Sequence, residues 1–169
     1  MLLIEGDDAT VLFDLTRPEC SETARRNTNI FQSVIRAADD SVPFAEHLIH
    51  RTEKGHLVRS KSELVIANML FQLGIPYEYE RVLDGTIAAG RLRPDFSFVT
   101  ADGDLLVWEH LGMLSRPNYK RGWEWKRTWY GKNGFAEGKT LFTSAEEDGK
   151  GLDSAELKKT ALTIRGCLE

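Results

Sequence analysis

Cysteine is scarce in this chain of 169 residues: Cys20 and Cys167 stand alone and far apart. Two cysteines without metal-ligand spacing argue against a disulfide framework and against a zinc finger. The sequence also has no apolar run near the roughly 18 residues that a membrane span needs, and its N-terminus lacks the basic and apolar regions of a secretory signal. We therefore expect a soluble, cytoplasmic protein with no membrane partner.

An excess of basic residues is absent as well, since the net charge is −4 at pH 7. The whole-chain charge of a typical nucleic-acid-binding protein is thus missing, although a local basic stripe can coexist with acidic metal ligands. Internal repeats and low-complexity segments are also absent. Hydrophobic residues make up 41% and charged residues 28% of the chain, which is ordinary for a globular protein. The length favours one compact domain.

The clearest periodic patterns lie between residues 58 and 165. Ser60 stands three residues before Glu63, as in a capping box, and apolar residues then follow one helical face as far as Gly74. Further patterns predict strands at 75–82, 91–99 and 105–111, a helix at 119–132, a strand at 139–144 and a helix at 154–165. This order predicts an α/β (α+β) fold with a small mixed sheet flanked by helices.

The first 57 residues give weaker signals: two short strands, a helix, and a second helix from Ser41 to about Arg51. We expect an N-terminal extension over residues 1–57 and a core over residues 58–167. Residues 168–169, Leu-Glu, resemble an expression-vector junction, which suggests that the chain was cut from a longer protein.

Two acids, Asp95 and Glu109, interrupt the apolar, aromatic-rich hairpin of residues 91–112. Burying a bare carboxylate costs several kcal/mol unless a cation or hydrogen bonds compensate it. A divalent metal is a natural partner, because Mg²⁺ takes oxygen ligands and commonly one or two carboxylates.

The register of the hairpin decides whether both acids can reach one ion. A two-residue connection, Asp102-Gly103, makes Glu109 face away from Asp95. A three-residue connection that starts at Ala101 and has Gly103 in the left-handed conformation puts the acids directly opposite each other. In that register their β-carbons lie roughly 4.5–5.5 Å apart, which suits a shared metal.

Pro94-Asp95, Glu109 on the next strand and Glu63 on the preceding helix resemble the PD-(D/E)XK nuclease superfamily. The segments WEHLGM and KRTWYGKNG are similar to nuclease domains appended to bacterial helicases, and the resemblance covers about residues 58–145. It implies a restriction-endonuclease-like core of order αβββαβ. It also implies that Asp95 and Glu109 bind Mg²⁺ or Mn²⁺, that the backbone carbonyl of Leu111 reaches the metal, and that Glu63 assists.

Leucine at position 111 departs from the family, which has a lysine there to orient or deprotonate the attacking water. Such families often recruit the lysine from the next helix. Lys126 and Tyr130 lie four residues apart and so share a helical face. Their spacing matches the Gln-three residues-Tyr motif of the recombination-nuclease branch, with Lys in place of Gln. We therefore expect Lys126 to be the catalytic lysine and Tyr130 and Glu80 to support the site.

A basic stripe runs through the segment that carries Lys126. It alternates with aromatic residues and includes Arg116, Lys120, Arg121 and Arg127. Its two interpretations are a solvated helix surface and a track for the phosphates of a nucleic acid beside the metal.

Together these residues predict a metal-dependent nuclease that hydrolyses phosphodiester bonds, of DNA rather than RNA, in DNA repair or defence. It would work as a domain of a larger helicase-like protein. The alternative, which Leu111 suggests, is a catalytically weak or inactive nuclease-fold module that binds nucleic acid or a partner domain.

Overall fold

Two antiparallel strands, β6 (Phe96–Val99) and β7 (Leu105–Leu111), form the centre of a four-stranded sheet. The sheet order is β3-β6-β7-β8, with β3 at Glu78–Tyr79 and β8 at Leu141–Ala145. Only β7 and β8 run parallel, and the helix α3 (Pro117–Lys132) is the crossover between them. The computed structural model describes residues 45–146 and 150–168, and within them the predicted α+β fold with a mixed sheet is confirmed.

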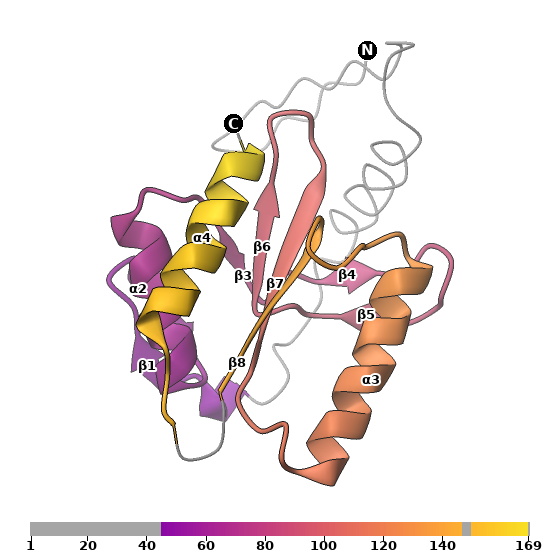
Figure 1. Ribbon diagram of the computed structural model, residues 1–169, viewed down its shortest axis with the longest axis horizontal. Coiled ribbons are helices and arrows are strands. Elements are labelled where there is room, and N and C mark those ends of the chain that lie inside the picture. The colour runs from indigo at the N-terminus through magenta and orange to yellow at the C-terminus, as the bar shows by residue number, and fades with distance from the viewer. Residues whose placement is uncertain (1–44, 147–149, 169) are drawn as a thin grey trace.

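Helices cover both faces of the sheet (Figure 1). The helices α2 (Lys61–Gln72) and α4 (Ser154–Leu168) pack on the face that carries Phe96, Phe98 and Trp108. On the other face, α3 covers apolar residues of β7 and β8, including Val107 and Leu141. Every residue of β7 is buried because the strand lies between these two apolar layers. The acid Glu109 is thus enclosed by the fold.

The capping box begins α2 as predicted. The side chain of Ser60 accepts a hydrogen bond of 3.1 Å from the backbone N–H of Glu63. Gly74, which follows the helix, has a φ of +68°, a conformation that glycine adopts without strain. The predictions for β7 and α4 are also confirmed, with α4 extending to Leu168, and α3 begins at Pro117 rather than at Tyr119.

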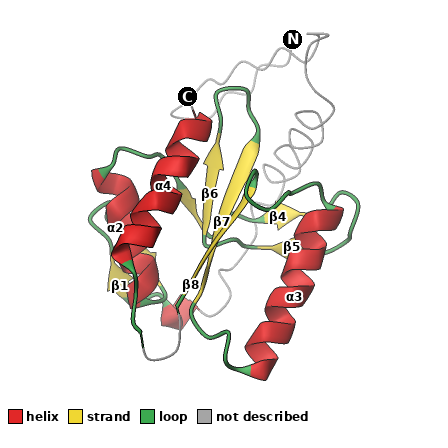
Figure 2. Cartoon of the chain, viewed as in Figure 1, coloured by secondary structure: helices red, strands yellow, loops and turns green. Residues whose placement is uncertain are grey.

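The predicted strands at 75–82 and 91–99 are shorter than expected and are reduced to β3 and β6 in the main sheet. A separate hairpin occupies residues 83–92 instead (Figure 2). It consists of β4 (Leu83–Asp84) and β5 (Arg91–Leu92), which pair with each other and not with the main sheet. Pro94 lacks the N–H that a continuous strand would need after β5. A Cβ at Gly85 would lie 1.8 Å from the carbonyl oxygen of Ala88, so the tight turn requires glycine there.

The helix predicted from Ser41 to about Arg51 is wrong for its described part. Ala45–His47 form a short 3₁₀ helix, η1, and His50–Arg51 form the strand β1, which pairs with β2 (Leu57–Val58). Strand pairing replaces the helix because Gly55, at a φ of +103°, lets the chain turn back. The earlier elements predicted in residues 1–44 lie outside the described residues. No helix in the described ranges has the length and apolar character that a bilayer crossing requires.

Candidate active site

The hairpin of β6 and β7 has the three-residue connection. Phe96 pairs with Trp108 and Val99 with Leu105, and Gly103 has a φ of +84°. Continuing this register by one residue places Asp95 opposite Glu109. The two acids therefore face the same side of the sheet, the side that α3 covers, and the register that we expected for a shared metal is confirmed.

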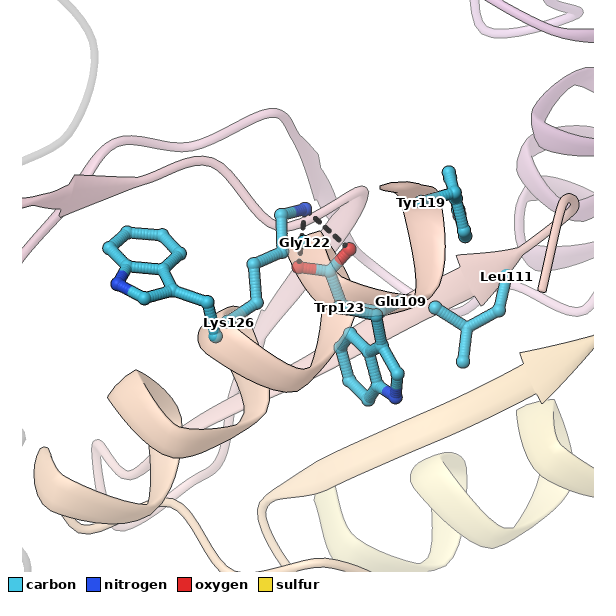
Figure 3. A pocket seen from close by; sticks show the side chains of 7 residues that line it. Glu109, Leu111, Tyr119, Gly122, Trp123 and Lys126 are labelled. Atoms are coloured by element: carbon cyan, nitrogen blue, oxygen red, sulfur yellow. Dashed lines mark hydrogen bonds and ion pairs between the residues drawn. The ribbon is translucent and has the colours of Figure 1, made fainter. Parts of the chain in front are cut away.

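Glu109 is 2% exposed and receives donors from two residues of α3. Nζ of Lys126 lies 3.1 Å from each of its carboxylate oxygens, and the hydroxyl of Tyr130 donates to Oε1 at 2.6 Å. Figure 3 shows the lysine reaching over the carboxylate. The structure thus brings Lys126 and Tyr130, which the helical spacing had placed on one face, together at Glu109.

Asp95 is hydrogen-bonded to the backbone of β7, the strand that carries Glu109. Its Oδ2 accepts a hydrogen bond of 2.6 Å from the backbone N–H of His110. Burial and the neighbouring charge of Glu109 raise the pKa of Asp95 well above its ordinary value. The charge of Glu109 thus disfavours ionisation of Asp95, and a divalent cation bound between the two carboxylates would relieve this repulsion.

The two residues that support Glu109 keep their protons. Burial alone would lower the pKa of Lys126, but the charges of Glu109 and Asp95 outweigh it and the pKa is raised. Burial and the charge of Glu109 raise the pKa of Tyr130 well above its ordinary value. Lys126 is therefore a fixed positive charge and Tyr130 a fixed hydrogen-bond donor.

Glu63 and Glu80 lie near the acid pair, but other residues hold their carboxylates. Glu63 accepts hydrogen bonds from Ser60 Oγ at 2.8 Å and from the Tyr79 hydroxyl at 2.5 Å, while its charge still contributes to the raised pKa of Asp95. Glu80 is engaged by Arg59 in a two-pronged ion pair. The carboxylates of Glu63 and Glu80 therefore bind other residues of the protein, and neither side chain forms a hydrogen bond with Asp95.

The carbonyl that points toward the acid pair is not the one that we expected. The Leu111 carbonyl accepts a hydrogen bond of 3.0 Å from the N–H of Glu146 and is directed at the β8 side of the strand. Carbonyls alternate along a strand, so the carbonyl of His110 faces the opposite side, where it lies 3.5 Å from the Tyr119 hydroxyl. We therefore replace the Leu111 carbonyl by that of His110 as the candidate backbone ligand.

The imidazole of His110 points to the other face of the sheet. Its Nδ1 lies 2.8 Å from Ser144 Oγ, and its Nε2 lies 3.2 Å from Glu146 Oε1. Ser144 also accepts a hydrogen bond of 2.9 Å from Trp108. This network fixes the strand whose backbone N–H and carbonyl are presented to the acid pair.

Apart from Lys126, the basic residues that we singled out on α3 and at its start are exposed and do not contact Glu109. Arg127 forms an ion pair with Glu137, and Arg121 donates to Asn118. Arg116 and Lys120 are also exposed. They form an accessible positive surface beside the site, which leaves both of our interpretations open.

Tyr119 and Gly122 belong to the site although sequence reasoning did not single them out. Both line a pocket of about 320 Å³ that is bounded by Glu109 and Lys126. The signal was present, since residues 119, 122 and 126 share a helical face with Tyr130.

The described part of the chain holds no cluster of three or more His, Cys, Asp or Glu side chains that could bind a metal ion. Asp95, Glu109 and the His110 carbonyl offer oxygen donors only. That set fits a hard ion such as Mg²⁺, which commonly takes one or two carboxylates and keeps waters.

A segment of 116 residues, 68% of this chain, is 39% identical to the "Uncharacterized protein MJ1519" of Methanocaldococcus jannaschii. The chain spans 9% of the length of that protein. No protein-family model and no solved structure match the chain.

Proposed function

We propose that this chain is a metal-dependent nuclease that hydrolyses phosphodiester bonds of nucleic acid, with DNA preferred to RNA. One observation carries the proposal: the pairing of β6 with β7, continued by one residue, puts Asp95 opposite Glu109, on the side where Lys126 contacts the carboxylate of Glu109. The resemblance to PD-(D/E)XK nucleases adds the reaction class and the preference for DNA.

Asp95 and Glu109 are the residues that would hold Mg²⁺ or Mn²⁺, with the His110 carbonyl as a third oxygen. When bound, such an ion polarises a phosphate and lowers the pKa of a water molecule. Within the protein, the backbone N–H of His110 orients Asp95, and the Tyr130 hydroxyl orients Glu109. These contacts fix both carboxylates before substrate arrives, as an efficient site requires.

Lys126 is the residue that we assign to the substrate. Its ammonium group is charged and part-exposed, so it can attract a phosphate oxygen and stabilise the negative charge that develops during hydrolysis. It acts as a cation and not as a proton acceptor, because its pKa is raised. The exposed arginines and lysines of α3 would bind flanking phosphates.

The setting is part of the same proposal. The matched relative is more than ten times longer than the segment that it shares with this chain. This length supports the view that the nuclease is one domain of a longer protein. The resemblance to nuclease domains of bacterial helicases is the reason to propose a helicase-like protein, in DNA repair or defence. A cytoplasmic location follows from the same interpretation.

A second function has its own observation. The symmetric contact between Lys126 and Glu109 neutralises one acid within the protein. Leu111 also leaves the usual lysine position apolar. A nuclease-like module that binds nucleic acid or a partner domain without cutting is consistent with both facts.

The deciding experiment is cleavage of linear, circular and single-stranded DNA, and of RNA, with Mg²⁺, Mn²⁺ or a chelator. The variants are Asp95→Asn and Glu109→Gln. The matched control is Asp102→Asn, an exposed acid at the turn of the same hairpin. We expect divalent-dependent cleavage that falls at least about 100-fold in both site variants and is unchanged in the control.

Equal cleavage by wild type and Asp95→Asn would exclude this mechanism. Binding of DNA without cleavage under every metal condition would establish the second function in its place.

A further inference from the structure

A pocket opens directly beside the acid pair, between the end of β7 and the part of α3 from Tyr119 to Lys126 (Figure 3). Its volume is about 320 Å³, and its walls are mainly aromatic and aliphatic. The lining side chains are Glu109, Leu111, Tyr119, Trp123, Trp125 and Lys126. The polar end of the pocket is therefore the candidate active site itself, and the other end is apolar.

Gly122 keeps the floor of the pocket open. A Cβ at this position would meet no atom within 4 Å. At about 100° per residue, Trp123 and Trp125 project on opposite sides of Gly122 around the helix. Trp123 packs against buried residues of the α3 side, whereas Trp125 is 55% exposed. One tryptophan is thus anchored and the other presents its ring to an incoming ligand.

Charge on the same helix selects an anionic ligand. Within Pro117–Lys132 the single acid is Glu124, and the basic residues are Lys120, Arg121, Lys126, Arg127 and Lys132. This positive helix belongs to a chain whose net charge is −4. A flat aromatic group linked to a phosphate matches an apolar pocket with a cationic rim.

We propose, on the basis of the function proposed above, that this pocket binds a nucleobase of an unpaired DNA strand. The pocket shares Glu109 and Lys126 with the candidate active site, so the bound base belongs to the nucleotide next to the phosphate that is cut. A base in duplex DNA is stacked and paired and cannot enter the pocket without leaving the helix. The substrate is therefore single-stranded DNA, held by stacking on Trp125 and by the charge of Lys126.

The test is binding of a fluorescein-labelled oligothymidylate to the full chain, measured by fluorescence anisotropy in a chelator. Trp125→Ala removes the exposed ring, and Gly122→Leu fills the pocket while favouring the helix. Phe71→Ala removes an exposed aromatic from α2 and is the matched control. A second ligand has the same length and charge but carries abasic residues.

We expect each pocket variant to weaken binding of the oligothymidylate by about 10-fold, which is typical of the loss of one base stack. The control should bind as wild type. The abasic ligand should bind more weakly to wild type and equally to all variants, and duplex DNA should be insensitive to both pocket variants. Equal binding of the abasic and base-containing ligands, or unchanged binding by both pocket variants, would overturn the proposal.

Failure of this inference is separable from failure of the proposed function. Base-dependent binding without any divalent-dependent cleavage would refute the nuclease and keep the pocket. Cleavage that depends on Asp95, with binding indifferent to Trp125 and to the bases, would refute the pocket and keep the nuclease.

Discussion

Nζ of Lys126 lies 3.1 Å from both carboxylate oxygens of Glu109, so a cation of the protein is centred on the acid that we assign to the metal. Glu109 is buried, and removing the ammonium group that contacts it leaves its charge poorly compensated. The lysine therefore stabilises the metal-free protein as well as serving the substrate. The two roles can be separated by experiment.

Lys126→Gln should lower the free energy of unfolding by about 1–3 kcal/mol in a chelator, because a buried carboxylate loses its cation. Turnover should fall by roughly 100- to 1,000-fold, since the developing charge on the phosphate loses its partner. Added Mn²⁺ should restore much of the lost stability, because the ion neutralises the same carboxylate. Urea unfolding with and without Mn²⁺ measures this.

The matched control for stability is Arg127→Gln, on the same helix and also in an ion pair, but exposed. Exposed ion pairs contribute little, so its unfolding curve should resemble that of wild type. An equal loss in both variants would mean that Glu109 does not depend on Lys126.

Asp95 predicts a pH dependence with a definite sign. Burial and Glu109 raise its pKa in the folded state, so the folded protein binds the proton more tightly than the unfolded chain does. The contribution of Asp95 to the free energy of unfolding is therefore most favourable at low pH, and it is lost as the pH rises through the raised pKa. Asp95→Asn cannot ionise, and its stability relative to wild type should therefore increase with pH.

Urea unfolding in a chelator at several pH values from 5 to 9 tests this expectation. Asp102→Asn, at the exposed turn of the hairpin, should keep the pH dependence of wild type. Mn²⁺ should stabilise wild type and not Asp95→Asn, because the ion binds the folded state through this carboxylate. A constant difference between wild type and Asp95→Asn across the pH range would contradict the assignment.

Local chemistry made much of this site predictable from the sequence. Gly103 permits the left-handed residue of a three-residue connection, and that choice alone sets the register of Asp95 and Glu109. The spacing of Lys126 and Tyr130 then puts both on the face of α3 that meets Glu109. In each case the deciding interaction lies within a few residues or within one helix.

What the sequence could not reveal depends on distant partners. The Leu111 carbonyl is directed at β8 because the N–H of Glu146 binds it, and this pairing is not visible in either segment. The loop between β4 and β5 is held by the buried side chain of Asn133, whose Oδ1 accepts from the N–H groups of Thr86 and Ile87 at 2.9 Å. Such contacts exist only after the elements have packed.

Gly103→Ala tests the turn that sets the register. A residue with a Cβ at a φ of +84° is strained, so the free energy of unfolding should fall by about 1–2 kcal/mol. Gly131→Ala is the counterpart, since it lies in the helix α3 with no atom within 4 Å of an added Cβ. That change should raise stability by up to about 1 kcal/mol. Thermal unfolding of the two variants should therefore shift in opposite directions, and a shift in the same direction would contradict the turn geometry.

Tyr130→Phe removes the hydroxyl that donates to Glu109 Oε1 at 2.6 Å and leaves the ring packing in place. We expect a loss of about 1–2 kcal/mol in unfolding free energy. Mn²⁺ affinity should fall about 10-fold, because the carboxylate loses the donor that orients it.

Tyr77→Phe is the matched control: among the described residues its hydroxyl is buried without a hydrogen-bond partner, and its removal should be neutral or stabilising. Calorimetric titration with Mn²⁺ separates the two cases, since only the tyrosine that contacts Glu109 can change metal binding. Equal Mn²⁺ affinity in Tyr130→Phe and wild type would show that this hydroxyl supports the fold and not the metal.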